Sequence, residues 1–273
     1  MKISLTIDNK DYSADLSEAR SIAISLLPDG EQPSHFGAPA CTSETLEGGG
    51  FVGDTKRGGS CNVNQLTIIP HCNGTHTESI SHIVNEMIPV HQAISSNLFP
   101  CVLISVTPSK ASEVTDHYTP GFDPDNLVIS RRALESALDS FDDSQLEGLV
   151  IRTKPNGIEK KVACYDESNY PVYLTADAMR YIVERSVSHL LVDFPSVDKM
   201  FDEGMLSNHR IFWRVPPGKT SINESSFLSK TITEMIYAHS YIADGLYLCN
   251  LQIPEIVTDA VPSRPELIPL VAL

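Results

Sequence analysis

The chain has 273 residues, of which 41% are hydrophobic and 20% charged, a composition typical of a globular protein. Its net charge of −15 argues against binding to nucleic acids or anionic membranes, because both depend on clusters of Lys and Arg. No run approaches the roughly 20 apolar residues of a membrane span. Six scattered cysteines without a CxxC pair indicate free thiols in a reducing compartment, so we expect a cytoplasmic protein.

The N-terminal part predicts short strands around a long polar segment. Residues 2–7 and 21–27 have the composition of strands. Residues 28–62 are rich in Gly, Pro, Ser and Thr, which predicts an irregular segment that could form a lid or a wall of a site. Residues 63–69 predict a strand that leads directly into a histidine-rich segment.

The remainder alternates between strand and helix patterns. Ser130 and Thr175 have the residue types that cap helices, and they precede predicted helices at 131–138 and from 176 to about 187. Strands are predicted at 102–106, 149–152, 189–193, 231–237 and 246–253, with a Pro/Gly/Ser-rich loop at 214–230. Neither an internal repeat nor a dividing linker is present. We therefore expect an α/β fold in one domain that spans residues 1–273.

The histidine-rich segment contains the side-chain types of a metal-binding site. Three of the nine histidines lie between residues 71 and 82, together with Cys72 and Glu78. These side-chain types bind borderline divalent metals such as zinc. In an extended backbone, His76 and Glu78 project to one side, together with Cys72 and His82. A polar loop whose histidines only form hydrogen bonds has equal weight from spacing alone, because neither a CxxC pair nor an HExxH motif is present.

Beyond spacing, this segment resembles a signature of the metal-dependent cyclase family, which includes kynurenine formamidase and isatin hydrolase. The family pattern is His-x-Gly-Thr-His-x-Asp-x-Pro-x-His, and the chain has Cys72-Asn73-Gly74-Thr75-His76-Thr77-Glu78-Ser79-Ile80-Ser81-His82. Residues 192–198 resemble the Asp-x-Pro-Ser-x-Asp element of the family, and His209 follows them. Residues 231–234 resemble a strand that delivers a late glutamate. The resemblance covers almost the whole chain.

The resemblance implies a fold, a site and an assembly. The fold is α/β, with mixed β-sheets at the core and flanking helices. A divalent metal centre of one or two ions would be held by His76, Glu78, His209 and Glu234. His82 would act as the general base, and Glu234 would belong to the catalytic group as well as to the metal ligands. The family also implies a homodimer or homotetramer.

The chain departs from the family signature at three positions. Cys72 stands where the family has its first histidine, and His71 precedes it. We favour Cys72 as the ligand because it preserves the register, with His71 as the alternative. A thiolate ligand makes zinc the first choice and manganese the second. Glu78 is one methylene longer than the aspartate of the family, and Ile80 replaces its proline.

The function that the resemblance implies is hydrolysis of an amide, formamide or lactam C–N bond, with an aromatic amide or lactam as the small-molecule substrate. His82 would move protons to and from the reacting groups. Asp193 and Asp198 are expected to fix loops, whereas His35 lies in the segment that could cover the site. Two alternatives stay open: a metal-assisted dehydratase or lyase, and a catalytically silent member that only binds a ligand.

Overall fold

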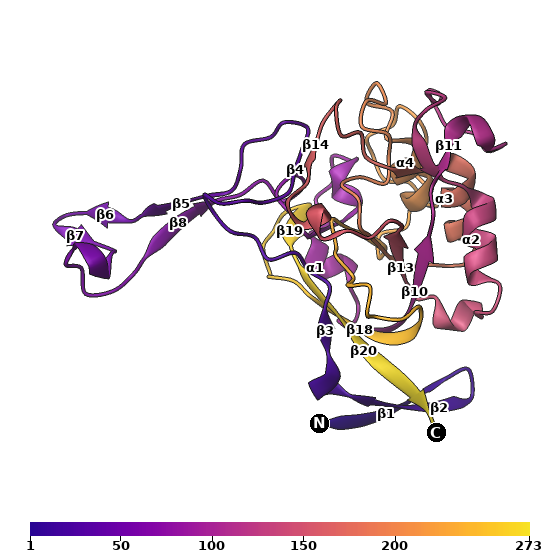
Figure 1. Ribbon diagram of the computed structural model, residues 1–273, viewed down its shortest axis with the longest axis horizontal. Helices are drawn as coiled ribbons and strands as arrows, with labels where there is room; N and C mark the ends of the chain where they lie inside the picture. The colour runs from indigo at the N-terminus through magenta and orange to yellow at the C-terminus, as the bar shows by residue number, and fades with distance from the viewer.

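The computed structural model describes residues 1–273, and its centre is one large mixed sheet (Figure 1). The eleven strands follow the order β1 (Lys2–Ile7), β2 (Lys10–Asp15), β20 (Arg264–Ala272), β18 (Gly245–Gln252), β10 (Leu98–Val106), β13 (Gly148–Thr153), β16 (His189–Val192), β17 (Thr231–Glu234), β9 (His76–Glu78) and β19 (Ala260–Pro262), with β3 (Arg20–Ser21) beside β20. The predicted α/β class with a mixed sheet is confirmed.

The middle of the sheet is parallel and buried on both faces. Strands β10, β13, β16 and β17 run parallel, and the strands outside them are antiparallel. Side chains alternate between two hydrophobic clusters, so that Ile104 and Ile151 lie in one cluster whereas Leu103 and Val150 lie in the other. Burial on both faces explains why these strands are continuous apolar runs in the sequence.

Helices flank one face of this sheet, where α2 and α3 lie next to each other (Figure 1). The α-helices are α1 (Val90–Ala93), α2 (Arg131–Leu138), α3 (Ala176–Glu184) and α4 (Ser207–Trp213). The Ser130 and Thr175 side chains accept hydrogen bonds from the backbone N–H groups of Ala133 and Ala178, so both predicted N-caps are present. None of these helices has the length and hydropathy that crossing a membrane requires.

The remaining elements are short. Small sheets are formed by β11 (Ser109–Lys110), β12 (Leu127–Ile129) and β15 (Tyr173–Leu174), by β4 (Ser34–His35) and β14 (Cys164–Tyr165), by β5 (Thr42–Thr45) and β8 (Asn64–Thr67), and by β6 (Glu47–Gly48) and β7 (Phe51–Val52). The 3₁₀ turns are η1 (Leu16–Glu18), η2 (Thr55–Arg57), η3 (Ile80–His82), η4 (Ala111–Glu113), η5 (Asp143–Gln145) and η6 (Ile158–Val162).

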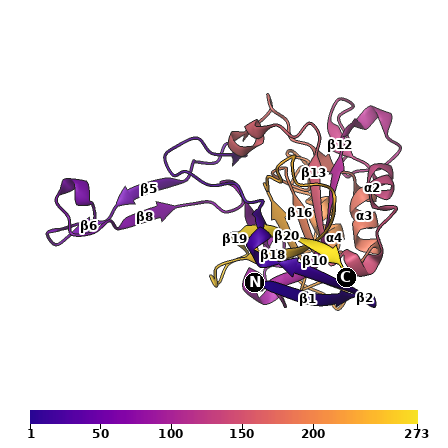
Figure 2. The same ribbon diagram turned by 60° about the horizontal axis from the view of Figure 1, so that its bottom comes forward.

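Residues 42–67, which we call the arm, project away from the sheet as a hairpin of β5 and β8 that carries β6, β7 and η2 (Figures 1 and 2). The expectation of an irregular lid over residues 28–62 is therefore wrong for the arm. The Thr-rich ends pair as strands, and the glycine-rich run 48–50 turns the chain between β6 and β7. The predicted strand at 63–69 is present as β8, but it belongs to the arm.

Two other predicted elements differ in extent. The strand expected at 21–27 is reduced to β3 and a single bridge from Ala23 to Ile236. Its backbone groups have other partners, because the N–H of Ile24 donates to the Thr75 hydroxyl at 2.8 Å. Helix α3 ends at Glu184 rather than near residue 187, since Ser186 adopts a left-handed φ of 61°.

Candidate metal centre

Strand β9 carries the middle of the histidine-rich segment into the sheet, between β17 and β19. His76 pairs directly with Glu234 across the antiparallel register, so the two side chains lie on the same face. Thr77 projects to the opposite face, where its hydroxyl lies 2.7 Å from that of Thr233. The alternation therefore places His76, Glu78 and Glu234 on one face of the sheet, as the sequence predicted for the first two residues.

The residues before β9 are held by tight backbone geometry. Gly74 has a φ of 124°, a conformation that side chains larger than hydrogen rarely adopt. The hydroxyl of Thr75 donates to the carbonyl of Met235 at 2.5 Å. Met235 follows Glu234 directly and itself has a left-handed φ of 53°. The Gly74-Thr75-His76 motif thus locks the loop against the end of β17.

His71 and His82 lie beside this face with a partner that the sequence analysis missed. The Nε2 atom of His71 is 3.0 Å from Asp259 Oδ2, and its Nδ1 atom is 3.1 Å from Glu78 Oε2. His82 Nδ1 is 3.7 Å from Asp259 Oδ2, and its Nε2 is 3.9 Å from Glu78 Oε2. His71 and His82 therefore each lie next to both carboxylates, those of Glu78 and Asp259.

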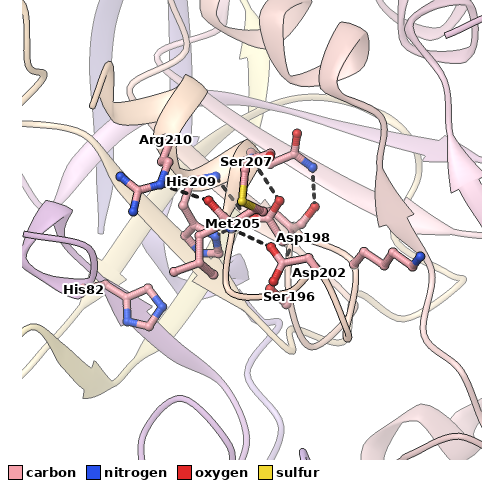
Figure 3. A network of polar contacts seen from close by, with 12 residues as sticks. His82, Ser196, Asp198, Asp202, Met205, Ser207, His209 and Arg210 are labelled. Carbon is pink, nitrogen blue, oxygen red and sulfur yellow. Dashed lines mark hydrogen bonds and ion pairs between the residues drawn. The ribbon is translucent and has the colours of Figure 1, made fainter. Parts of the chain in front are cut away.

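His209 approaches from α4 and is fully buried (Figure 3). Its Nδ1 atom is 2.6 Å from Asp198 Oδ2, and its Nε2 atom is 2.8 Å from Glu78 Oε1. Asp198 also accepts hydrogen bonds from the backbone N–H of Asn208 and the hydroxyl of Tyr118. It thereby fixes the start of α4 and the orientation of the His209 ring.

These contacts shift the pKa values of the buried groups. Burial alone would raise the pKa of Glu78, but the charges of His82 and His209 hold it well below its usual value. Burial alone would lower the pKa of His209, but Glu78 and Asp198 raise it well above 6.5. Likewise, the pKa of His71 rises to about 10 against the effect of burial, because Asp259 and Glu78 flank its ring. The charged forms of Glu78 and of the two histidines His71 and His209 therefore favour one another.

Within the cluster, Nε2 of His76 is a buried atom without a hydrogen-bond partner, and Oε2 of Glu78 has only its ion-pair contacts with His71 and His82. His76 Nε2 is 3.5 Å from Glu234 Oε2, in a geometry that makes no hydrogen bond. Buried polar atoms are rarely left unpaired, and a metal ligand atom is one of the ordinary exceptions. The donor set of imidazoles and carboxylates also suits zinc or manganese.

Three overlapping groups of side chains each place their ligand atoms within 4.8 Å of one another: His71, His76 and Glu78; Glu78, His82 and His209; and His71, His82 and Asp259. The residues thus fit a metal site. Glu78 belongs to two of the groups, which makes it the centre of the cluster.

The cluster opens into a cavity of about 200 Å³. Its walls include residues from the cluster, from the 195–209 segment and from β4, namely His35, Phe36, His71, Cys72, His82, Pro195, Ser196, Asp198, Lys199, Asp202, Leu206, His209 and Glu234. The backbone N–H of Val197 donates to Glu234 Oε1 at 2.8 Å, so this glutamate is held at the cavity wall.

The structure brings together most of the predicted site residues. His76, Glu78, His82, His209 and Glu234 converge, and their roles as ligands or base stay predictions. Cys72 lines the cavity, where burial and the charge of Glu234 raise the pKa of its thiol. The three groups include His71 and not Cys72, so the choice between these two ligands stays a prediction.

Asp259 is the residue that sequence reasoning missed. It lies in a proline-punctuated tail, where no spacing marks it as a ligand. Asp259 directly precedes β19, and the pairing of β19 with β9 brings it next to His71. Asp193 and Asp198 fix loops, as expected; Asp193 accepts hydrogen bonds from the N–H and hydroxyl of Thr153.

Comparison with known proteins identifies a family model and solved structures that are similar to this chain. A family model described as "Putative cyclase" matches residues 3–199. Comparison with curated protein sequences finds no match. Similar solved structures include a predicted metal-dependent hydrolase from Bacillus stearothermophilus, with a TM-score of 0.57 at 15% identity over 92% of this chain and 97% of that chain.

Isatin hydrolases are also among the similar structures. Isatin hydrolase A from Labrenzia aggregata, bound to benzyl benzoate, has a TM-score of 0.58 at 13% identity over 92% of this chain and 94% of that chain. An isatin hydrolase bound to the product analogue thioisatinate has a TM-score of 0.58 at 12% identity over 94% of both chains. At these identities the likeness shows a shared fold. Together with the family model, which matches well over half of the sequence, it establishes that the chain belongs to the cyclase family.

Proposed function

We propose that the protein is a metal-dependent hydrolase of a small amide, formamide or lactam, which cleaves a C–N bond that does not belong to a peptide. The observation that carries the proposal is the cluster around Glu78, in which four histidines and three carboxylates meet beside a cavity that four of these seven residues line. The isatin hydrolases of similar fold support the reaction class.

His76, Glu78, His209 and Glu234 would hold the metal, with Cys72 or His71 as a further ligand. Zinc is our first choice and manganese the second, and the overlapping groups accommodate one ion or two. When bound, such an ion lowers the pKa of water and polarises a carbonyl group. The chain's own residues must position the substrate and move the protons.

His82 is the residue best placed to move protons. Its side chain is 26% exposed, whereas His76 and His209 are fully enclosed. Its distances of 3.7 and 3.9 Å to Asp259 and Glu78 leave the ring free to exchange hydrogen bonds. His82 would take a proton from the attacking water and return it to the leaving nitrogen. Glu234, held by the Val197 N–H, would orient the reacting groups.

The substrate we propose is an aromatic amide or lactam. The cavity volume of about 200 Å³ suits a small molecule, and the Phe36 ring at its wall offers a flat apolar surface. A homodimer or homotetramer, as the family resemblance implies, stays part of the proposal.

The test combines metal content with activity. Plasma mass spectrometry would measure zinc and manganese in the wild type and in His76→Ala, Cys72→Ala and His71→Ala. The same samples would be assayed against an N-formyl aromatic amine and an isatin-like lactam. We expect His76→Ala to lose both metal and activity, and the other two variants to identify the remaining ligand. His117→Ala, at an exposed histidine, is the matched control.

Failure to bind zinc or manganese, even after incubation with excess of either ion, would contradict the proposal and leave a ligand-binding protein. Full metal occupancy without hydrolysis of either substrate class would instead point to other metal-assisted chemistry, such as dehydration.

A further inference from the structure

A second cavity lies between α3 and α4, apart from the one at the metal centre. Its volume is about 170 Å³, and the two cavities share no wall residue. Arg180 of α3 lines it, as do Ser207, Arg210 and Ile211 of α4. His209 of the same helix lines the cavity at the metal centre instead. Helix α4 therefore contributes to both cavities, and a molecule bound in the second one contacts none of the candidate metal ligands.

Arg210 has hydrogen-bond partners, but no carboxylate is among them. Its Nε group donates to the carbonyl of Met205 at 2.9 Å (Figure 3). Its Nη1 group donates to the carbonyls of Pro216 and Lys219 at 3.2 and 2.7 Å. Its Nη2 group makes no hydrogen bond within the chain. Because carbonyl oxygens carry no net charge, the positive charge of Arg210 is not neutralised, and one donor edge is free for an anion from outside the chain.

Further cations lie near Arg210. Arg180 donates from Nη1 to Asp177 Oδ1 at 2.8 Å, and its Nε and Nη2 groups have no hydrogen-bond partner within the chain. The guanidinium of Arg214, at the end of α4, lies 4.2 Å from the centroid of the Phe227 ring rather than next to a carboxylate. In a chain of net charge −15, this is a local concentration of positive charge. Complementary charge attracts anions to such a place.

Much of the remaining cavity wall is apolar. The apolar wall residues are Ala176, Met205, Ile211, Val215 and Pro217. Cavities of this kind bind a ligand with a hydrophobic body and orient it through a few polar groups. Guanidinium groups match the geometry of a carboxylate with two parallel hydrogen bonds. The carboxylate of Asp177 beside Arg180 opposes a second negative charge, which favours a monocarboxylate over a phosphate ester.

We propose that the cavity between α3 and α4 is a binding site for a small monocarboxylate with an apolar body, such as an aromatic acid. The carboxylate pairs with Arg210 and Arg180, and the apolar body packs against Ile211 and Val215. Binding at this site requires neither the metal nor hydrolysis, so the inference goes beyond the proposed function.

The experiment follows the fluorine NMR signal of 4-fluorobenzoate during titration with the protein. 4-Fluorobenzamide has the same ring without the charge, and fluoroacetate has the charge without the ring. We expect saturable binding of 4-fluorobenzoate to the wild type, with a Kd about tenfold or more below those of the other two compounds. Such a result would show that the charge and the apolar surface both contribute to binding.

Substitutions at the cavity wall test the location of the site. Arg210→Gln should weaken binding of 4-fluorobenzoate about tenfold or more, because it removes a charged donor. Met205→Glu places a carboxylate of the chain next to Arg210 and should abolish saturable binding. Arg180→Gln should weaken binding by a smaller factor, because Asp177 already holds one edge of that guanidinium. The matched control is Met87→Glu, which introduces the same charge at an exposed methionine outside the cavity and should bind as the wild type does.

His76→Ala separates this inference from the proposed function. A carboxylate can also bind a metal ion, and this variant lacks a candidate metal ligand. We expect His76→Ala to keep the binding that Met205→Glu abolishes, whether or not the wild type hydrolyses an amide. Loss of 4-fluorobenzoate binding in His76→Ala would assign the ligand to the metal centre and overturn the proposal. Wild-type affinity in Met205→Glu, equal affinities for 4-fluorobenzoate and 4-fluorobenzamide, or no saturable binding to the wild type would overturn it as well.

Discussion

The arm and the segment 73–80 are close neighbours in the sequence, yet their environments are opposite. Residues 73–80 are all buried, and they contain His76 and Glu78. The arm is largely exposed, including the apolar side chains of Leu46 and Leu66. Ionisable groups thus lie in the interior while leucines lie at the surface, the reverse of the usual distribution.

The difference shows that the unfavourable free energy of burying charged groups is concentrated in the segment 73–80. Buried charges are expensive unless they are paired, and the cluster around Glu78 pairs them with histidines drawn from several elements. A two-stranded hairpin such as the arm contributes little stability of its own. We expect substitutions in the first region to affect metal, activity and stability strongly, and substitutions in the second to affect them weakly.

The largest effect is expected for Glu78→Ala. It removes the carboxylate shared by two of the candidate ligand groups and leaves His209 without one partner. Bound metal should be lost, and kcat/KM should fall by about 10³-fold or more, since one of the proposed central ligands is absent. Plasma mass spectrometry and steady-state kinetics would measure both. Glu47→Ala in the arm, at an exposed ion pair with Arg57, is the control. Wild-type metal content in Glu78→Ala would contradict the expected difference between the cluster and the arm.

A smaller effect is expected for Asp198→Asn, which weakens the partner of His209 Nδ1 without removing a candidate ligand. Substitution of such supporting groups typically costs 10–100-fold in metal affinity. Competition with a chromophoric chelator would give the affinity. Asp54→Asn, at a helix cap in the arm, should leave it unchanged. Equal affinities for Asp198→Asn and the wild type would show that the ring of His209 is oriented by packing alone.

Stability should depend on pH through His189, a buried histidine of the sheet. Burial lowers its pKa from 6.5 to about 4, so only the unfolded chain takes up this proton between these values. Stability is therefore lost as the pH falls from about 6.5 towards 4. The contribution is about 2 kcal/mol between pH 7 and pH 5. Urea unfolding of the wild type and His189→Gln at both pH values measures it, and a parallel loss in both proteins would assign the effect elsewhere.

The smallest effect is expected for Leu66→Ser in the arm, where the side chain is 60% exposed. An exposed substitution changes the free energy of unfolding by less than about 0.5 kcal/mol. Denaturant titration, with light scattering on the same samples, would check this. A larger loss accompanied by a smaller particle size would mean that a second copy of the chain covers the arm in solution.

Local signals made much of the fold predictable. The apolar runs of β10, β13 and β16 and the caps at Ser130 and Thr175 are encoded within a few residues. The resemblance to the cyclase family supplied most of the cluster, including His209. Contacts that depend on long-range pairing escaped prediction. Asp259 joins the cluster only through β19, and the polarity of the arm's sequence did not distinguish a projecting hairpin from a lid.

The origin of the site in distant parts of the chain has a consequence for synthesis in the cell. A ribosome releases His71 to His82 long before Glu234 and Asp259, which complete the cluster. During that interval β9 lacks both of its neighbours in the sheet, because β17 and β19 lie more than 150 residues further along the chain. Pairings of this sequence separation form late in folding. An ion that meets the nascent chain would find these histidines and Glu78 without Glu234 and Asp259, so loading is expected to follow release of the finished protein.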